Sequence, residues 1–203
     1  MEMRKQVYLI ADPSLKEELL IKKVSAAIRG GVHLVQLWNN WPLGTVNEEL
    51  IKKVHEVCAI GTTKLILNAD LSWAEYPFID GLHLDEPTDL SQLQRRKDFV
   101  IGLTVNNDRT IIDWAAGNKV DYLSFCSMFP SGTSNSCEMV QFETVQYATE
   151  TYQLPVYLAG GIRHETLGKL HSLKFDGIAL VSAIMDAENP ENEVKKYLNY
   201  MNK

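Results

Sequence analysis

Small residues follow two apolar runs near the C-terminal end of the chain. Residues 156–159 lead into two glycines, the second of which is Gly161, and a later run ends at Val181 before Ser182. Where a helix follows such a run, its first N–H groups are free and its N-terminus is partially positive. Glycine also lets an anion approach the backbone closely. The sequence therefore predicts a phosphate site at Gly161, Val181 and Ser182, although a tight turn and a helix cap would also account for these residues.

Amide and hydroxyl side chains stand at the ends of three other apolar runs. Gln36, Trp38 and Asn40 are two residues apart, so they share one face if the strand continues through them. Asn68 ends a second run, and Thr104 ends a third. An inward-pointing glutamine is more than a packing choice, although an uncharged plug bonded to its neighbours would explain Gln36 equally well. A ligand contact and a packed plug therefore both stay open for Gln36.

Carboxylates cluster after two neighbouring runs. Asp70 follows the run that ends in Asn68, and the segment GLHLDEPTDL carries Asp85, Glu86 and Asp89. Oxygen ligands from adjacent strand ends can hold Mg²⁺, which often keeps several waters. A solvated acidic loop, or caps of short helices, would account for the same residues. His83, in the same segment, is interpreted as a hydrogen-bonded core histidine rather than a base.

Hydroxyls and glycine are concentrated in the loop PSGTS, where Ser131, Thr133 and Ser134 lie. Such a loop can wrap a phosphate or diphosphate with side-chain and backbone donors, or it can serve only as a lid. Cys126 lies in the apolar run before this loop, and no motif marks it as a nucleophile. We interpret Cys126 as a core residue.

Strand-like and helix-like segments alternate along the whole chain. Short, near-continuous apolar runs are typical of parallel strands covered on both faces. This pattern predicts an α/β fold, a single-domain (β/α)₈ barrel over residues 1–203, with its active site at the carboxyl ends of the strands. An open doubly wound sheet would instead show a GxGxxG turn after the first strand, where this chain has ADPS. The expected strands are residues 7–11, 32–38, 64–68, 80–84, 99–103, 120–127, 156–159 and 177–181.

Three sequence signals mark helix starts. Ser14 precedes Glu17 and Thr45 precedes Glu48 at the spacing of a capping box. Asn189 is followed directly by a proline, which favours the first turn of the last helix.

Composition narrows the class of protein. The 203 residues are 45% hydrophobic, which is ample for a core. No apolar run approaches the ~20 residues of a membrane span, and we see no signal peptide. The net charge is −6 without a basic run, so nucleic acid is not expected as a partner. Three cysteines without CxxC spacing fit a reduced compartment, and a cytoplasmic protein is expected.

These segments resemble the thiamine-phosphate synthase family and its thiazole tautomerase relatives over nearly the whole chain. YLIADP is similar to the family's first strand, and GVHLVQLWNN to its second. PVYLAGGI followed by DGIALVSAIMDAENP is the most specific part, because both blocks and their spacing fit without gaps. The resemblance implies a transferase of thiamine biosynthesis. It would join hydroxymethylpyrimidine diphosphate to thiazole phosphate and release diphosphate, with Mg²⁺ on the diphosphate.

The resemblance also implies roles for individual residues. The pyrimidine would lie near Gln36 and Asn68, with Thr104 in the place of a family serine. The thiazole phosphate would sit on the Gly161 and Ser182 segments, with the Ser131–Thr133 loop closing over it. The implied candidates for catalysis are Gln36, Asn68, Thr104 and Ser134.

Three cations of the family pattern are replaced. Its strand-2 Arg is Trp38, its nearby Lys is Asn40, and the Lys of its strand-6 loop is Ser134. Hydrogen bonds to charged groups are worth roughly 1.5–3 kcal/mol each, so three losses would cost about 4–9 kcal/mol. That is a factor of about 10³ to 10⁶ in transition-state stabilisation unless Lys64, Arg163 or a metal compensates.

The metal ligands of the family pattern are also shifted. The Asp after the strand-3 Asn is Ala69, and Asp70 follows it at once. The second aspartate corresponds to Asp89 with one inserted residue, or alternatively to Glu86. We therefore expect Asp70 and Asp89 to be the Mg²⁺ ligands that the resemblance implies.

The replaced cations keep two alternatives open. One is an isomerase of thiazole phosphate like the tautomerase branch, in which His83 or Cys126 would move the proton because Ser127 replaces that branch's histidine. The other is a protein that binds a thiamine-related phosphate without chemistry. All three hypotheses expect small phosphorylated ligands and no membrane. A homodimer is expected from the family and from aromatics such as Tyr197 and Tyr200.

Overall fold

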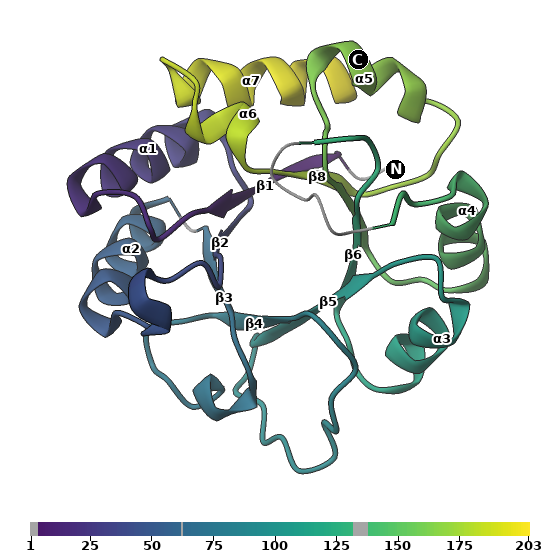
Figure 1. The fold of residues 1–203 in the computed structure, drawn as a ribbon, viewed down its shortest axis with the longest axis horizontal. Helices are drawn as coiled ribbons and strands as arrows, with labels where there is room; N and C mark the ends of the chain where they lie inside the picture. Colours follow the sequence, from purple (N-terminus) through teal and green to yellow (C-terminus); the bar gives the residue numbers. More distant parts are fainter. Residues whose placement is uncertain (1–3, 62, 132–137) are drawn as a thin grey trace.

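Eight parallel strands close into a barrel in the computed structural model, which describes residues 4–61, 63–131 and 138–203. Each strand pairs with the next along the chain, and the last pairs with the first. Helices lie around the outside of this ring (Figure 1). The predicted (β/α)₈ barrel is confirmed. The strands are β1 Gln6–Ala11, β2 Leu34–Leu37, β3 Lys64–Asn68, β4 Gly81–Leu84, β5 Val100–Val105, β6 Tyr122–Cys126, β7 Val156–Ala159 and β8 Gly177–Leu180.

The helical layer is uneven around the barrel. Long helices cover β1 and β2, whereas the segments after β3 and β4 contribute only turns and one short 3₁₀ helix within residues 69–99. The α-helices are α1 Glu17–Gly30, α2 Glu48–Ile60, α3 Arg109–Gly117, α4 Phe142–Thr151, α5 His164–Leu167, α6 Ser182–Met185 and α7 Pro190–Met201. The 3₁₀ helices are η1 Pro42–Gly44, η2 Leu71–Trp73 and η3 Gly168–Leu170.

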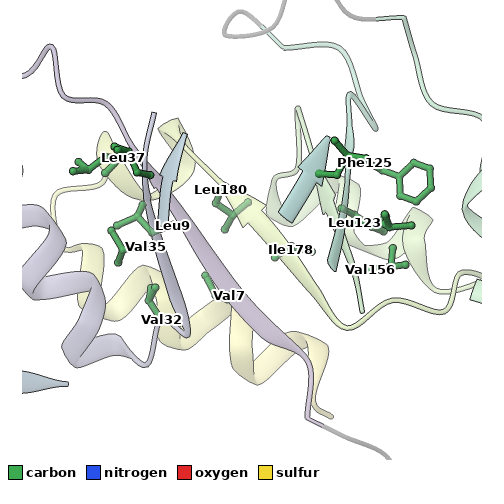
Figure 2. Packing of buried hydrophobic residues seen from close by; sticks show 14 of the residues in the cluster. Val7, Leu9, Val32, Val35, Leu37, Leu123, Phe125, Val156, Ile178 and Leu180 are labelled. Atoms are coloured by element: carbon green, nitrogen blue, oxygen red, sulfur yellow. The ribbon is translucent and has the colours of Figure 1, made fainter. Parts of the chain in front are cut away.

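Side chains alternate between two hydrophobic layers along each strand, as the period of two requires. The outer layer lies between the strands and the helices, and it includes Val7, Leu9 and Leu123 (Figure 2). The inner layer fills the barrel and is built around Tyr8 and Tyr122 together with smaller apolar residues. Burial of both strand faces explains why the runs look continuously apolar in sequence.

Two of the three predicted helix starts need correction. Lys16, rather than Ser14, precedes α1, and no side chain caps it. Asn47, rather than Thr45, caps α2, because its side chain accepts the Leu50 N–H at 3.1 Å. The start of α7 is confirmed, since the Asn189 side chain accepts the Asn192 N–H at 3.0 Å.

Two sequence expectations concern the molecular surface. Tyr197 is only 1% exposed and stacks on His164 with ring centroids 4.2 Å apart, so it is not a surface aromatic. Tyr200 is partly exposed, as expected, and the homodimer stays a prediction. Within the described ranges, no helix combines the length and apolar character needed to cross a membrane.

Candidate active site

A cavity of about 260 Å³ opens at the carboxyl ends of the strands. Parallel pairing places these ends together, which is where barrel enzymes have their active sites. Most of the residues that the sequence singled out for substrate binding line this one cavity. They are Gln36, Trp38, Asn68, Thr104, Ser131, Gly161, Val181 and Ser182.

The remaining predicted residues have other positions. Asn40 lies outside the cavity lining because β2 ends at Leu37, so the expected alternation stops before it. Its side-chain amide donates to the Asp12 carboxylate at 3.0 Å and 3.1 Å. Thr133 and Ser134 fall outside the described residues, so their placement stays a prediction.

The floor of the cavity is a buried polar chain. The Tyr8 hydroxyl donates to Gln36 Oε1 and lies 2.9 Å from the Tyr122 hydroxyl. His83 continues the chain, with Nδ1 at 2.9 Å from the Tyr122 hydroxyl and Nε2 at 2.9 Å from Thr104 Oγ1. Burial lowers the pKa of His83 to about 4, so its ring is neutral at pH 7. The interpretation of His83 as a hydrogen-bonded core histidine is confirmed.

Asp85 lines the cavity, and it is one of the carboxylates that the sequence analysis considered for a magnesium site. Its Oδ2 accepts the Asn68 and Asn39 amides, each at 3.2 Å. Asn68 also donates to the His83 carbonyl at 3.1 Å, which fixes the amide between two neighbouring strands. The Asp85 residue is exposed overall, but partial burial of its carboxyl raises its pKa.

Asp70 and Asp89, the expected magnesium ligands, both begin turns. Asp70 accepts the Ser72 N–H at 2.8 Å, and Asp89 accepts the Ser91 N–H at 2.8 Å. Both are exposed, and these hydrogen bonds lower the pKa of each carboxyl. Neither lines the cavity. Among the described residues, no three His, Cys, Asp or Glu side chains group closely enough to hold a metal ion by themselves.

The β7 and β8 side of the cavity is built from backbone. Gly160 and Gly161 have φ of 84° and 64°, a region that side chains other than glycine rarely adopt. A Cβ on Gly161 would also come within 2.4 Å of the Phe129 carbonyl oxygen. The glycines are therefore required by the turn itself. Val181 and Ser182 follow the neighbouring strand β8, where α6 begins.

Arg163 is the one Lys or Arg side chain among the described residues that line the cavity. It follows the Gly160–Gly161 turn and so belongs to the β7 side. Lys64, the other residue considered as compensation, starts β3 at the opposite end of the barrel, so that expectation is wrong. Cys126 packs against the inner hydrophobic layer but also lines the cavity, so it is not solely a core residue.

Comparisons with known proteins agree with this architecture. A family model described as thiamine monophosphate synthase matches residues 7–184. Thiamine-phosphate synthase from Hydrogenobaculum sp. is 29% identical over 188 residues, covering 90% of this chain and 87% of that protein. The enzyme of that name from Methanobrevibacter smithii is 27% identical over 198 residues, covering 94% of each. A solved structure of thiamine phosphate pyrophosphorylase from Pyrococcus furiosus has a TM-score of 0.75 at 21% identity, covering 98% of this chain and 97% of that one.

Fold and cavity together define a (β/α)₈-barrel protein with its site at the carboxyl ends of the strands. The chain belongs to the thiamine monophosphate synthase family. The predicted family, and the transferase class that it carries, are confirmed.

Proposed function

We propose that this protein is a thiamine-phosphate synthase, which joins hydroxymethylpyrimidine diphosphate to thiazole phosphate. The thiazole nitrogen lone pair forms a bond to the pyrimidine methylene carbon, the carbon–oxygen bond to diphosphate breaks, and diphosphate leaves with that electron pair. The observation that carries the proposal is the shared cavity. Residues implied for the pyrimidine and residues implied for the thiazole phosphate line one space.

The thiazole phosphate is proposed to bind at the β7 and β8 side. Backbone N–H groups near Gly161 and Ser182 offer donors, and the left-handed turn leaves no side chain in the way. Arg163 adds the positive charge that a phosphate prefers. Ser131 lines the cavity between these segments and is proposed as a further contact.

The pyrimidine is proposed to bind over Gln36, Asn68 and Thr104. Trp38 lines the same side and offers an aromatic face for a ring. These residues orient the methylene carbon, so their contribution to the reaction is positioning. Gln36, Asn68 and Thr104 are also the proposed candidates for direct contact with the reacting substrate.

Magnesium is proposed to act on the diphosphate, where it would neutralise the charge of the leaving group. The donor set fits a metal held mostly by substrate and water, because Mg²⁺ typically uses one or two protein carboxylates. Asp85 is the acidic residue that lines the cavity, and we add it to the predicted ligands Asp70 and Asp89.

The synthase proposal is tested by incubating the purified protein with both substrates and Mg²⁺ and following thiamine phosphate by liquid chromatography. We expect product that depends on both substrates and on the metal. A Gly161→Val variant, which would clash in the turn, is expected to make none. A Lys64→Gln variant is the matched control, since that side chain lies at the far end of the barrel. Absence of product above the no-enzyme background would contradict the proposal.

The geometry does not favour His83 as the proton-transfer residue of the isomerase alternative. Both ring nitrogens of His83 are occupied by hydrogen bonds inside the barrel, so the ring has no free nitrogen for a substrate proton. Ser127, which stands where the tautomerase branch has histidine, is 2% exposed and donates to the Phe129 carbonyl at 3.3 Å.

A further inference from the structure

The buried polar chain joins two residues that line the cavity from different strands. Gln36 is at one end and Thr104 is at the other, with Tyr8, Tyr122 and His83 between them. The three connecting side chains are 0–4% exposed, so bulk water does not compete for their hydrogen bonds. The donor-to-acceptor order of these hydrogen bonds therefore decides whether Gln36 and Thr104 each offer a ligand a donor or an acceptor.

The direction follows from Gln36. Its Oε1 accepts the single hydrogen of the Tyr8 hydroxyl. Tyr8 then has no hydrogen for Tyr122, so the Tyr122 hydroxyl must donate to Tyr8 across 2.9 Å. The Tyr122 oxygen in turn accepts from His83, which requires a hydrogen on Nδ1.

His83 passes this direction to the cavity. His83 is 4% exposed and both ring nitrogens face neutral hydroxyl groups, so its ring is neutral and holds one N–H, which the hydrogen-bond chain assigns to Nδ1. Nε2 is then an acceptor, and it takes the hydrogen of Thr104 Oγ1 across 2.9 Å. Thr104 is left with lone pairs only, while Gln36 is left with the hydrogens of its Nε2.

We propose that Tyr8, Tyr122 and His83 are positioning residues that make Gln36 a donor and Thr104 an acceptor toward the substrate. The two contacts are coupled, because reversing one requires a half-turn of the Gln36 amide and reversal of all four hydrogen bonds. The identity of the ligand rests on the proposed function. The donor role of Gln36 and the acceptor role of Thr104 rest only on the buried hydrogen bonds.

This polarity selects one edge of a heteroaromatic ring. A 4-aminopyrimidine presents a ring nitrogen acceptor beside an amino donor, which matches a donor at Gln36 and an acceptor at Thr104. The 4-oxo analogue presents an N–H donor beside a carbonyl acceptor, which is the reverse. A site with fixed polar groups rejects the reversed pattern because its buried groups are left unpaired.

The first test reads the tautomer of His83 without any ligand. Nitrogen-15 NMR of the full-length protein at pH 7 distinguishes Nδ1–H from Nε2–H, and the resonance is assigned by its loss in His83→Gln. We expect the Nδ1–H form. An Nε2–H form, or an equal mixture of both, overturns the proposal. Because no substrate is used, failure of the synthase assay leaves this result decisive.

The second test compares two tyrosine variants in the same layer. Tyr122→Phe cuts the chain, whereas Tyr157→Phe removes a hydroxyl that bonds Gln6 outside it. The Tyr157 ring packs 5.5 Å and 5.3 Å from the other two tyrosine rings, so the variants disturb similar surroundings.

Binding of the 4-amino and 4-oxo hydroxymethylpyrimidine diphosphates is measured with Mg²⁺ by calorimetry. We expect the unaltered protein and Tyr157→Phe to prefer the amino compound by on the order of 100-fold, and Tyr122→Phe to prefer it by less than about 10-fold. Thiazole phosphate affinity is expected to stay the same in all three. Equal preference in all three proteins overturns the proposal. If neither pyrimidine binds, the proposed function fails, and the NMR measurement of the His83 tautomer then decides this inference by itself.

Discussion

The two sides of the cavity offer a ligand different groups, mainly backbone on one side and side chains on the other. The β7–β8 side uses backbone N–H groups and a glycine turn, with Arg163 beside it. The β2–β4 side uses side chains such as Gln36 and Asn68, and Trp38 stands there where the resemblance predicts an arginine. A substitution removes a charged side chain in one step, but it leaves the backbone donors in place. We infer that the proposed phosphate site, which is made of backbone, tolerates sequence change better than the proposed diphosphate site, which depends on side chains.

Breaking the backbone side should give the largest effect. Gly161→Ala is expected to lower thiazole phosphate affinity more than about 100-fold, because a Cβ would meet the Phe129 carbonyl and strain at φ 64° costs about 1–3 kcal/mol. Calorimetry measures the affinity, and thermal unfolding measures the stability.

Gly44→Ala is the matched control for strain. Gly44 has φ of 67°, but no atom lies within 4 Å of an added Cβ and the residue does not line the cavity. It should lose stability with thiazole phosphate affinity unchanged. Equal losses of affinity in both variants would contradict a specific role for the Gly161 turn.

Restoring a cation on the side-chain half should give the next largest effect. Trp38→Arg is expected to tighten pyrimidine diphosphate binding about 10- to 100-fold, since a hydrogen bond to a charged group is worth roughly 1.5–3 kcal/mol. Asn40→Lys is the control, because Asn40 lies outside the cavity lining and should gain little. Weaker diphosphate binding in Trp38→Arg would show that the tryptophan contributes more than the missing charge.

Removing the Arg163 charge should weaken thiazole phosphate binding at the β7–β8 side without abolishing it. Arg163→Gln is expected to lower thiazole phosphate affinity about 10-fold, in line with one charged contact among several. Arg163→Lys should retain most of the affinity. The phosphate contribution of Arg163 is refuted if the Gln variant binds as tightly as the unaltered protein.

The smallest expected effect concerns Asp85. Asp85→Asn should raise the Mg²⁺ concentration for half-maximal activity a few-fold. Asp108→Asn is the control, because Asp108 caps α3 and does not line the cavity. Burial raises the pKa of Asp85, so as pH falls its carboxylate is protonated at a higher pH than an ordinary aspartate would be. The magnesium requirement of the unaltered protein should therefore increase toward low pH, and that increase should be smaller in Asp85→Asn. Identical magnesium titrations in all variants would remove Asp85 from the metal site.

The barrel was predictable because each strand is buried on both faces and so reads as an apolar run between helix signals. Cavity residues such as Gln36 and Thr104 were predictable because strand ends of a parallel barrel meet at one end. Asn40 was placed wrongly because sequence does not show where pairing stops, and β2 ends at Leu37.

The buried chain was missed for a different reason. Tyr8 and Tyr122 sit in apolar runs and look like core aromatics. The available signal was His83 and Gln36, since buried polar groups need partners. Which tyrosine reaches which partner depends on the stagger of strands around the closed barrel, and that stagger is not written in any local pattern.

The most direct test of the difference between the two sides is paired calorimetry with the unaltered protein. Thiazole phosphate is titrated with and without Mg²⁺, and pyrimidine diphosphate is titrated in the same way. The account predicts that thiazole phosphate binds in both conditions, while pyrimidine diphosphate binds only when Mg²⁺ is present. Tight binding of the diphosphate without metal, or no binding of thiazole phosphate at all, would contradict it.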